Sequence, residues 1–163
     1  MPIATRMSSL EKSIGLSLVL LALCASAQTE NTTHFNIELR YETPVSPEVD
    51  AVFMAAKNRW ESVITTDIGT TVEIAQGMEI CGKVAQTQEC VDDMLIYVNV
   101  QEIDGEGQVL ANAGPCGLDS QGRVRVGVMN FDLADLQRLI ELGRATTVVL
   151  HEMGHVSSID KTR

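Results

Sequence analysis

The residues best suited to chemistry are the two histidines and the glutamate of the pentapeptide HEMGH, at positions 151–155 of the 163-residue chain. His151 and His155 are four residues apart, a spacing that puts both side chains on one face of a helix, within reach of one metal ion. Glu152 would lie about 100 degrees round such a helix from His151, where it can hold a water molecule without ligating the ion. Zinc would lower the pKa of that water to about 7 and polarise a peptide carbonyl. The pattern therefore predicts His151 and His155 as zinc ligands and Glu152 as the general base of a peptide hydrolase.

The context of the pentapeptide favours this chemistry over a structural role. A pattern with these three fixed positions arises by chance in about one in several hundred chains of this size. The stretch TTVVL before His151 carries no charge, as expected for a helix buried beneath a cleft. A carboxylate in such a helix, between two histidines, is costly unless it is paired or lies near a metal. A purely structural role would leave Glu152 unexplained.

The strands that must support this helix are indicated by alternating or continuous apolar runs. These runs predict strands at residues 34–41, 71–75, 94–100, 109–113 and 123–129. The sequence Gly114-Pro115-Cys116-Gly117 predicts the end of the fourth strand. The predicted elements follow the order strand, helix, several strands, helix and helix, which is not a regular βαβ alternation. We therefore expect an α+β fold, with a mixed sheet packed on two long helices, the second of which carries HExxH.

Helix boundaries are indicated by capping residues. Ser46 suits an N-cap before Pro47, and apolar residues then recur at helical spacing as far as Ile64, with Phe53 and Trp60 read as core packing. Asp132 suits the cap of a second helix that Gly143 can end, and residues 145–157 form the last helix.

The N-terminus resembles a targeting segment. A weakly basic start, an apolar run at residues 14–23 and the small-residue sequence Ala25-Ser26-Ala27 predict a signal peptide at residues 1–27 and a mature domain at residues 28–163. The apolar run has about half the length needed to cross a bilayer, so we expect no stable membrane span. The alternatives are a buried N-terminal helix and, as a minor one, lipidation at Cys24. The prediction is a secreted protein, or a periplasmic one in a bacterium.

Charge and cysteine content narrow the function further. The formal net charge is −10, which repels phosphate and makes nucleic acid an improbable partner. The mature chain would keep three cysteines, Cys81, Cys90 and Cys116, and export would expose them to an oxidising environment. Three single bridges are possible, each leaving one thiol over, and the sequence does not choose among them.

The sequence HEMGH preceded by VVL, with the upstream stretch LANAGPCGLDSQGRVRVGVMNFD, resembles metzincin-type zinc metallopeptidases, and most closely leishmanolysin-like secreted peptidases. The resemblance covers about the last two thirds of the chain. It implies a twisted mixed sheet above the active-site helix, with an edge strand, here residues 109–113, aligning an extended protein or peptide substrate. It implies a zinc-dependent endopeptidase with Zn²⁺ as its cofactor.

The chain departs from the metzincin pattern after His155. Metzincins continue as HExxHxxGxxH, whereas this chain has Ser158 and Lys161 at the positions of the glycine and the third histidine. The leishmanolysin-like variant places its third histidine further downstream, after an insertion. His34, the remaining histidine, is expected to have a surface or edge role. We therefore expect a catalytic domain that is incomplete at its C-terminus; the alternative is a non-catalytic, exported acidic binding or structural domain derived from such a peptidase.

Overall fold

The computed structural model describes residues 34–157, so the predicted signal peptide lies outside the described residues. The helices are α2 (Pro47–Glu61), α3 (Leu133–Glu141) and α4 (Ala145–Ser157). The strands are β1 (Ile37–Tyr41), β2 (Val72–Ile74), β3 (Glu79–Ile80), β4 (Lys83–Val84), β5 (Glu89–Val91), β6 (Met94–Gln101), β7 (Ala111–Leu118) and β8 (Val124–Asp132). Within this part of the chain no helix is long and apolar enough to cross a membrane.

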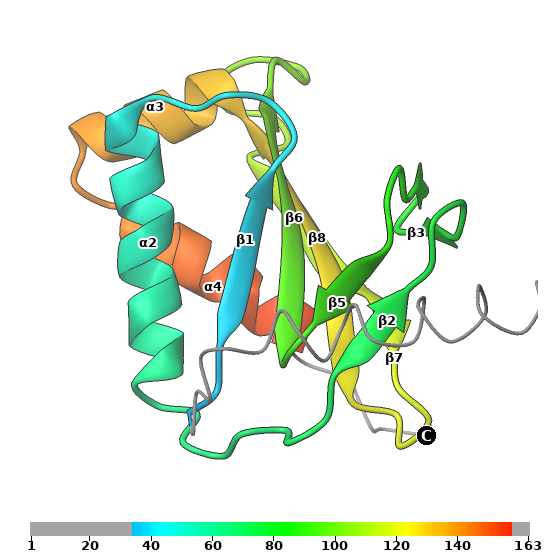
Figure 1. Ribbon diagram of the computed structural model, residues 1–163. Coiled ribbons are helices and arrows are strands. Elements are labelled where there is room, and N and C mark those ends of the chain that lie inside the picture. The colour runs from blue at the N-terminus through cyan, green and yellow to red at the C-terminus, as the bar shows by residue number, and fades with distance from the viewer. Residues whose placement is uncertain (1–33, 158–163) are drawn as a thin grey trace, which may run out of the picture. The chain divides into compact units, whose positions relative to one another are not determined.

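The main sheet has four strands in the order β1-β6-β8-β7. β1 and β8 both run parallel to β6, whereas β7 runs antiparallel to β8, which makes the sheet mixed, as predicted. The helices lie on one side of this sheet and the short strands β2, β3 and β5 on the other (Figure 1). Residues 94–98 of β6 are all buried, because a central strand covered on both faces has no solvated side. The structure confirms the predicted α+β class.

A large apolar core fills the space between the sheet and the helices. Phe53 of α2, Phe131 of β8 and Met153 of α4 are fully buried in it, and the rings of Phe53 and Phe131 pack edge to face at 5.2 Å between centroids. Phe53 therefore has the core role that its helical spacing indicated. The helix ends earlier than predicted, because α2 stops at Glu61; Val63 beyond it is 55% exposed, whereas Ile64 still packs against the core.

A layer of short strands covers the second face of the sheet. The sequence predicted one of its strands, at residues 71–75, but not the others. β2 pairs with β5 and β3 pairs with β4, both antiparallel. Ile74 and Val91 of this layer pack on Leu95 and Val126 of the main sheet. Arg125, 1% exposed, holds this layer in place. Its guanidinium donates hydrogen bonds to the carbonyl oxygens of Val91, at the end of β5, and of the loop residues Thr70, Asp92 and Asp93.

The β3–β4 hairpin is joined covalently to β7. Its two turn residues, Cys81 and Gly82, both have positive φ (56° and 72°), as a two-residue hairpin turn with the twist of its strands requires. Cys81 forms a disulfide with Cys116, with their Cα atoms 5.3 Å apart. This choice among the possible bridges could not be made from the sequence. Cys90 is also disulfide-bonded, so the described cysteines include no free thiol, contrary to the expected odd one.

β7 is longer than predicted. The sequence placed a strand at 109–113 and ended it at Gly114-Pro115-Cys116-Gly117, but the strand runs from Ala111 through this tetrapeptide to Leu118. Pro115 is tolerated because β7 is an edge strand, where a missing N–H need not break a ladder. The register shifts between Pro115 and Gly117, so Cys116 lies in a bulge.

The capping residues that the sequence indicates lie at the start of α2 and at both ends of α3. The Ser46 hydroxyl accepts a hydrogen bond from the Val49 N–H at 3.3 Å, and Gly143, with φ of 67°, follows α3 in the left-handed conformation. Asp132 caps α3 through Ala134 and also accepts hydrogen bonds from the N–H groups of Ile103, Asp104 and Gly105. One carboxylate thus fixes both α3 and the loop after β6. Hydrogen bonds from backbone N–H groups lower the pKa of Asp132 to about 2 despite its burial, and the bond from Ile103 makes the largest contribution to this shift.

We expect the contribution of Asp132 to stability to disappear in acid. A carboxylate whose folded pKa is depressed stabilises the fold above its unfolded pKa of about 3.9 and loses that effect as the pH falls towards 2. Urea unfolding should show Asp132→Asn less stable than wild type at pH 6, with the difference shrinking between pH 4 and pH 2. Glu141→Gln, at an exposed carboxylate of α3, controls for charge and should change stability little. A difference that is constant with pH would contradict this assignment.

Gly127 of β8 lets α4 approach the sheet closely. A Cβ atom at this position would lie 2.2 Å from Cγ1 of Val156, whose side chain is fully buried. No side chain other than hydrogen fits there unless α4 moves away.

We therefore expect Gly127→Ala to destabilise the protein by about 1–3 kcal/mol, the usual cost of overpacking a core. The matched control is Gly114→Ala on the neighbouring strand, where no heavy atom lies within 4 Å of the added methyl group; it should stay within about 0.5 kcal/mol of wild type. Denaturant unfolding measures both. Equal effects of the two substitutions would contradict the close approach inferred here.

Candidate metal centre on α4

The α4 helix buries one face and exposes the other. Val149, Met153 and Val156 are fully buried in the core. Because successive residues step about 100 degrees round a helix, His151 and His155 fall on the opposite side, and both are exposed. Glu152 lies at the boundary, with 9% of its surface exposed. The apolar residues around the motif thus determine which way its polar residues face.

The predicted ligands are brought together. Nε2 of His151 lies 3.0 Å from Nε2 of His155, with the two rings nearly perpendicular at 89°. One oxygen of Glu152 and one nitrogen of each histidine lie within 4.8 Å of one another. Within residues 34–157 these three residues form the one group of histidine, cysteine and acidic side chains placed to hold a metal ion.

The geometry fits zinc. Two nitrogens bound at about 2.0–2.1 Å in a tetrahedral site stand about 3.3 Å apart, close to the observed separation of the histidine nitrogens. Imidazole nitrogen is also among the ligand atoms that zinc prefers. Of the described residues, His34 does not join the group; it is exposed and precedes β1 rather than lying in it, in agreement with the surface role expected. The described residues therefore bring together two imidazoles that could ligate a metal ion and one adjacent carboxylate.

The strand next to α4 is an edge strand. β7 pairs with β8 on one side, lies at the end of the main sheet and packs against α4 (Figure 1). Its position agrees with the expectation for residues 109–113, although its bounds are Ala111–Leu118. Such a strand offers unpaired backbone N–H and C=O groups along its free edge.

Trp60 has a role near the motif that the sequence did not show. Its ring packs against the core, as predicted, but its indole N–H also donates a hydrogen bond to the carbonyl oxygen of Leu150, 3.0 Å away. Leu150 immediately precedes His151. A tryptophan in the last turn of an apolar helix gives no indication of its partner 90 residues on, so this contact is visible only in the structure.

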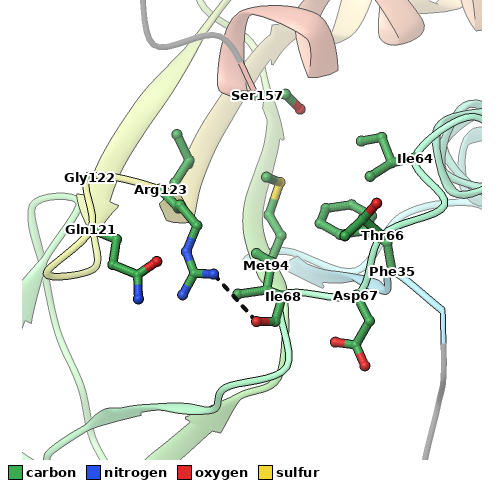
Figure 2. Close-up of a pocket in the computed structure, with 11 residues that line it drawn as sticks. Phe35, Ile64, Thr66, Asp67, Ile68, Met94, Gln121, Gly122, Arg123 and Ser157 are labelled. Carbon is green, nitrogen blue, oxygen red and sulfur yellow. Dashed lines mark hydrogen bonds between the residues drawn. The ribbon is translucent and has the colours of Figure 1, made fainter.

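A cleft of about 520 Å³ lies at the end of α4 but does not contain the motif. Figure 2 shows Ser157, the last residue of α4, beside an apolar floor that includes Phe35, Ile64 and Met94. Arg123 borders the cleft and donates a hydrogen bond to the carbonyl of Ile68 at 3.3 Å. None of the three motif residues lines this cleft. The candidate metal centre lies instead on the side of the helix, where both histidines are exposed.

Comparison with known proteins agrees with this geometry. No curated protein matches the chain. The sequence profile of the leishmanolysin family matches residues 59–163, which is more than half of the chain and includes the last turn of α2, the edge strand and the HEMGH helix. The chain therefore belongs to the leishmanolysin family, a family of zinc metallopeptidases.

Proposed function

We propose that this protein is a secreted zinc endopeptidase in which His151 and His155 bind the metal and Glu152 is the general base. The observation that carries the proposal is the grouping of two exposed histidines with the mostly buried Glu152 on α4, with one possible ligand atom of each within 4.8 Å of the others. Export rests on the predicted signal peptide at residues 1–27 and on the family, whose members are generally secreted or surface proteins. The substrates would be proteins or peptides.

The side chains of α4 divide the chemistry between them. Zinc, when bound, would polarise the scissile carbonyl and make water acidic enough to react near neutral pH. Glu152 is one residue from His151 and mostly buried, so its carboxylate is held beside the ligands rather than turned into solvent. A carboxylate oxygen of Glu152 would accept the proton of the attacking water and later donate it to the leaving amine nitrogen.

The edge strand β7 would align the substrate. An extended peptide can add to a free strand edge through main-chain hydrogen bonds, which hold it in line without selecting its sequence. β7 is suited to this because its other edge is paired with β8 and it packs against α4, the helix that carries the motif. A peptide bond held there would lie near the histidines.

A second candidate function is a non-catalytic, acidic binding or structural domain that is exported but cleaves nothing. One observation favours it: a catalytic zinc site takes three protein ligands, and residues 34–157 bring two imidazoles together. This candidate predicts zinc binding without hydrolysis, so the two functions can be separated by measuring both.

We expect Glu152→Gln to lower the rate of peptide hydrolysis by about 10²–10⁴-fold, the contribution of a general base, while zinc still binds. His155→Ala should lose the metal, since a single imidazole would remain on the helix. Zinc content by mass spectrometry and cleavage of a quenched fluorescent peptide would be measured on the full chain, with and without a chelator. Glu141→Gln is the charge-matched control and should behave as wild type.

Hydrolysis that survives Glu152→Gln would overturn the assigned general base. Stoichiometric zinc binding by the wild type without cleavage of any peptide in a mixed library would favour the non-catalytic domain. Absence of zinc binding by the wild type would overturn the metal centre itself.

A further inference from the structure

Trp60 contacts α4 at both turns that carry the histidines. Its indole N–H donates to the carbonyl oxygen of Leu150, the residue before His151. Its ring faces Gly154, the residue before His155, where an added Cβ would lie 3.4 Å from Cζ2 of the indole. Leu150 and Gly154 are four residues apart and so lie on one face of the helix, next to the face of the histidines.

The indole hydrogen bond restricts how α4 can move. A carbonyl oxygen has two lone pairs, so that of Leu150 can accept from the indole and also from the backbone N–H four residues on, as in any helix. A directional bond to one carbonyl opposes both sliding of α4 along its axis and rotation about it. Apolar contacts alone, which have no preferred direction, resist these motions less.

We propose that Trp60 is a positioning residue for the metal centre, fixing the rotation and axial position of α4 so that His151, Glu152 and His155 meet at one point. The inference rests on the proposed function, because it concerns the same metal site. The two contacts of Trp60 described above are with Leu150 and Gly154, which precede the histidines in the chain and do not belong to the group. It acts through the helix backbone, much as an outer hydrogen bond orients a metal ligand.

Substituting Trp60 with phenylalanine tests this role, since an aromatic ring is kept near Gly154 while the N–H donor is lost. We expect zinc affinity, measured by competition with a chromophoric chelator, to fall about 10-fold, the lower end of the effect of removing such outer contacts. The matched control is Phe53→Leu on the same helix, a fully buried core residue that packs on Tyr41 and Phe131. It should lower the stability of the metal-free protein to a comparable degree but leave zinc affinity within twofold.

A second measurement uses the unmodified ring. Trp60 is the one tryptophan of the chain, so fluorescence excited at 295 nm reports on it alone. If the indole bond strengthens zinc binding, zinc binding must strengthen the indole bond by the same free energy, because coupling between sites is reciprocal. Zinc has a filled d shell and no redox chemistry, so a change in emission reflects the indole surroundings. We expect zinc to change the emission of the wild type and of Glu152→Gln, but not that of His155→Ala.

The outcomes separate this inference from the function on which it rests. If the wild type binds no zinc, the metal centre fails. If the wild type binds zinc but Trp60→Phe binds it equally well, or if stoichiometric zinc leaves the indole emission unchanged, the metal centre stands and the positioning role is wrong. Equal losses of affinity in Trp60→Phe and Phe53→Leu would show a general effect of stability and would also overturn it.

Discussion

The candidate metal centre depends on how α4 packs against the sheet. Val149, Met153 and Val156 are fully buried, so the helix has one favourable rotation about its axis. In that rotation the two histidines are exposed and Glu152 lies at the edge of the core. Gly127 sets the separation, because Val156 occupies the space that a Cβ at residue 127 would need. Residues with no chemical role thus determine where the chemical ones point.

The layer on the far face of the sheet supports the edge strand beside this helix. β7 has a hydrogen-bonded neighbour on one side, and a strand held from one side is free to bend or pair elsewhere. The disulfide between Cys81 and Cys116 joins it to the β3–β4 hairpin at its bulge, and Ile80 of that hairpin packs where Gly117 has no side chain. β7 is therefore held from the face of the sheet, while its outer edge has no strand partner among the described residues.

Features set by local sequence were predicted well. The helical position of the motif, the caps Ser46 and Asp132 and the helices that they begin depend on neighbours within a few residues, and the structure confirms them. β3 and β4 have two residues each, too few to show any period, so their layer was missed. The end of β7 was misplaced because glycine and proline usually mark turns, whereas here the position of the strand at the edge of the sheet makes them acceptable. The partner of Cys81 and the burial of Arg125 depend on tertiary contacts that no local pattern encodes.

Two aromatic residues of α2 show the same contrast between a role that local sequence predicts and a role that depends on a tertiary contact. Phe53 contributes apolar volume to the core, a role that other side chains of similar size can fill. Trp60, two turns further on, also aims an N–H group at one particular carbonyl, a role that depends on direction as well as volume. The leishmanolysin profile begins at residue 59, so it includes Trp60 and leaves out Phe53. The part of α2 within the family match is thus the turn that contacts the helix of the metal centre.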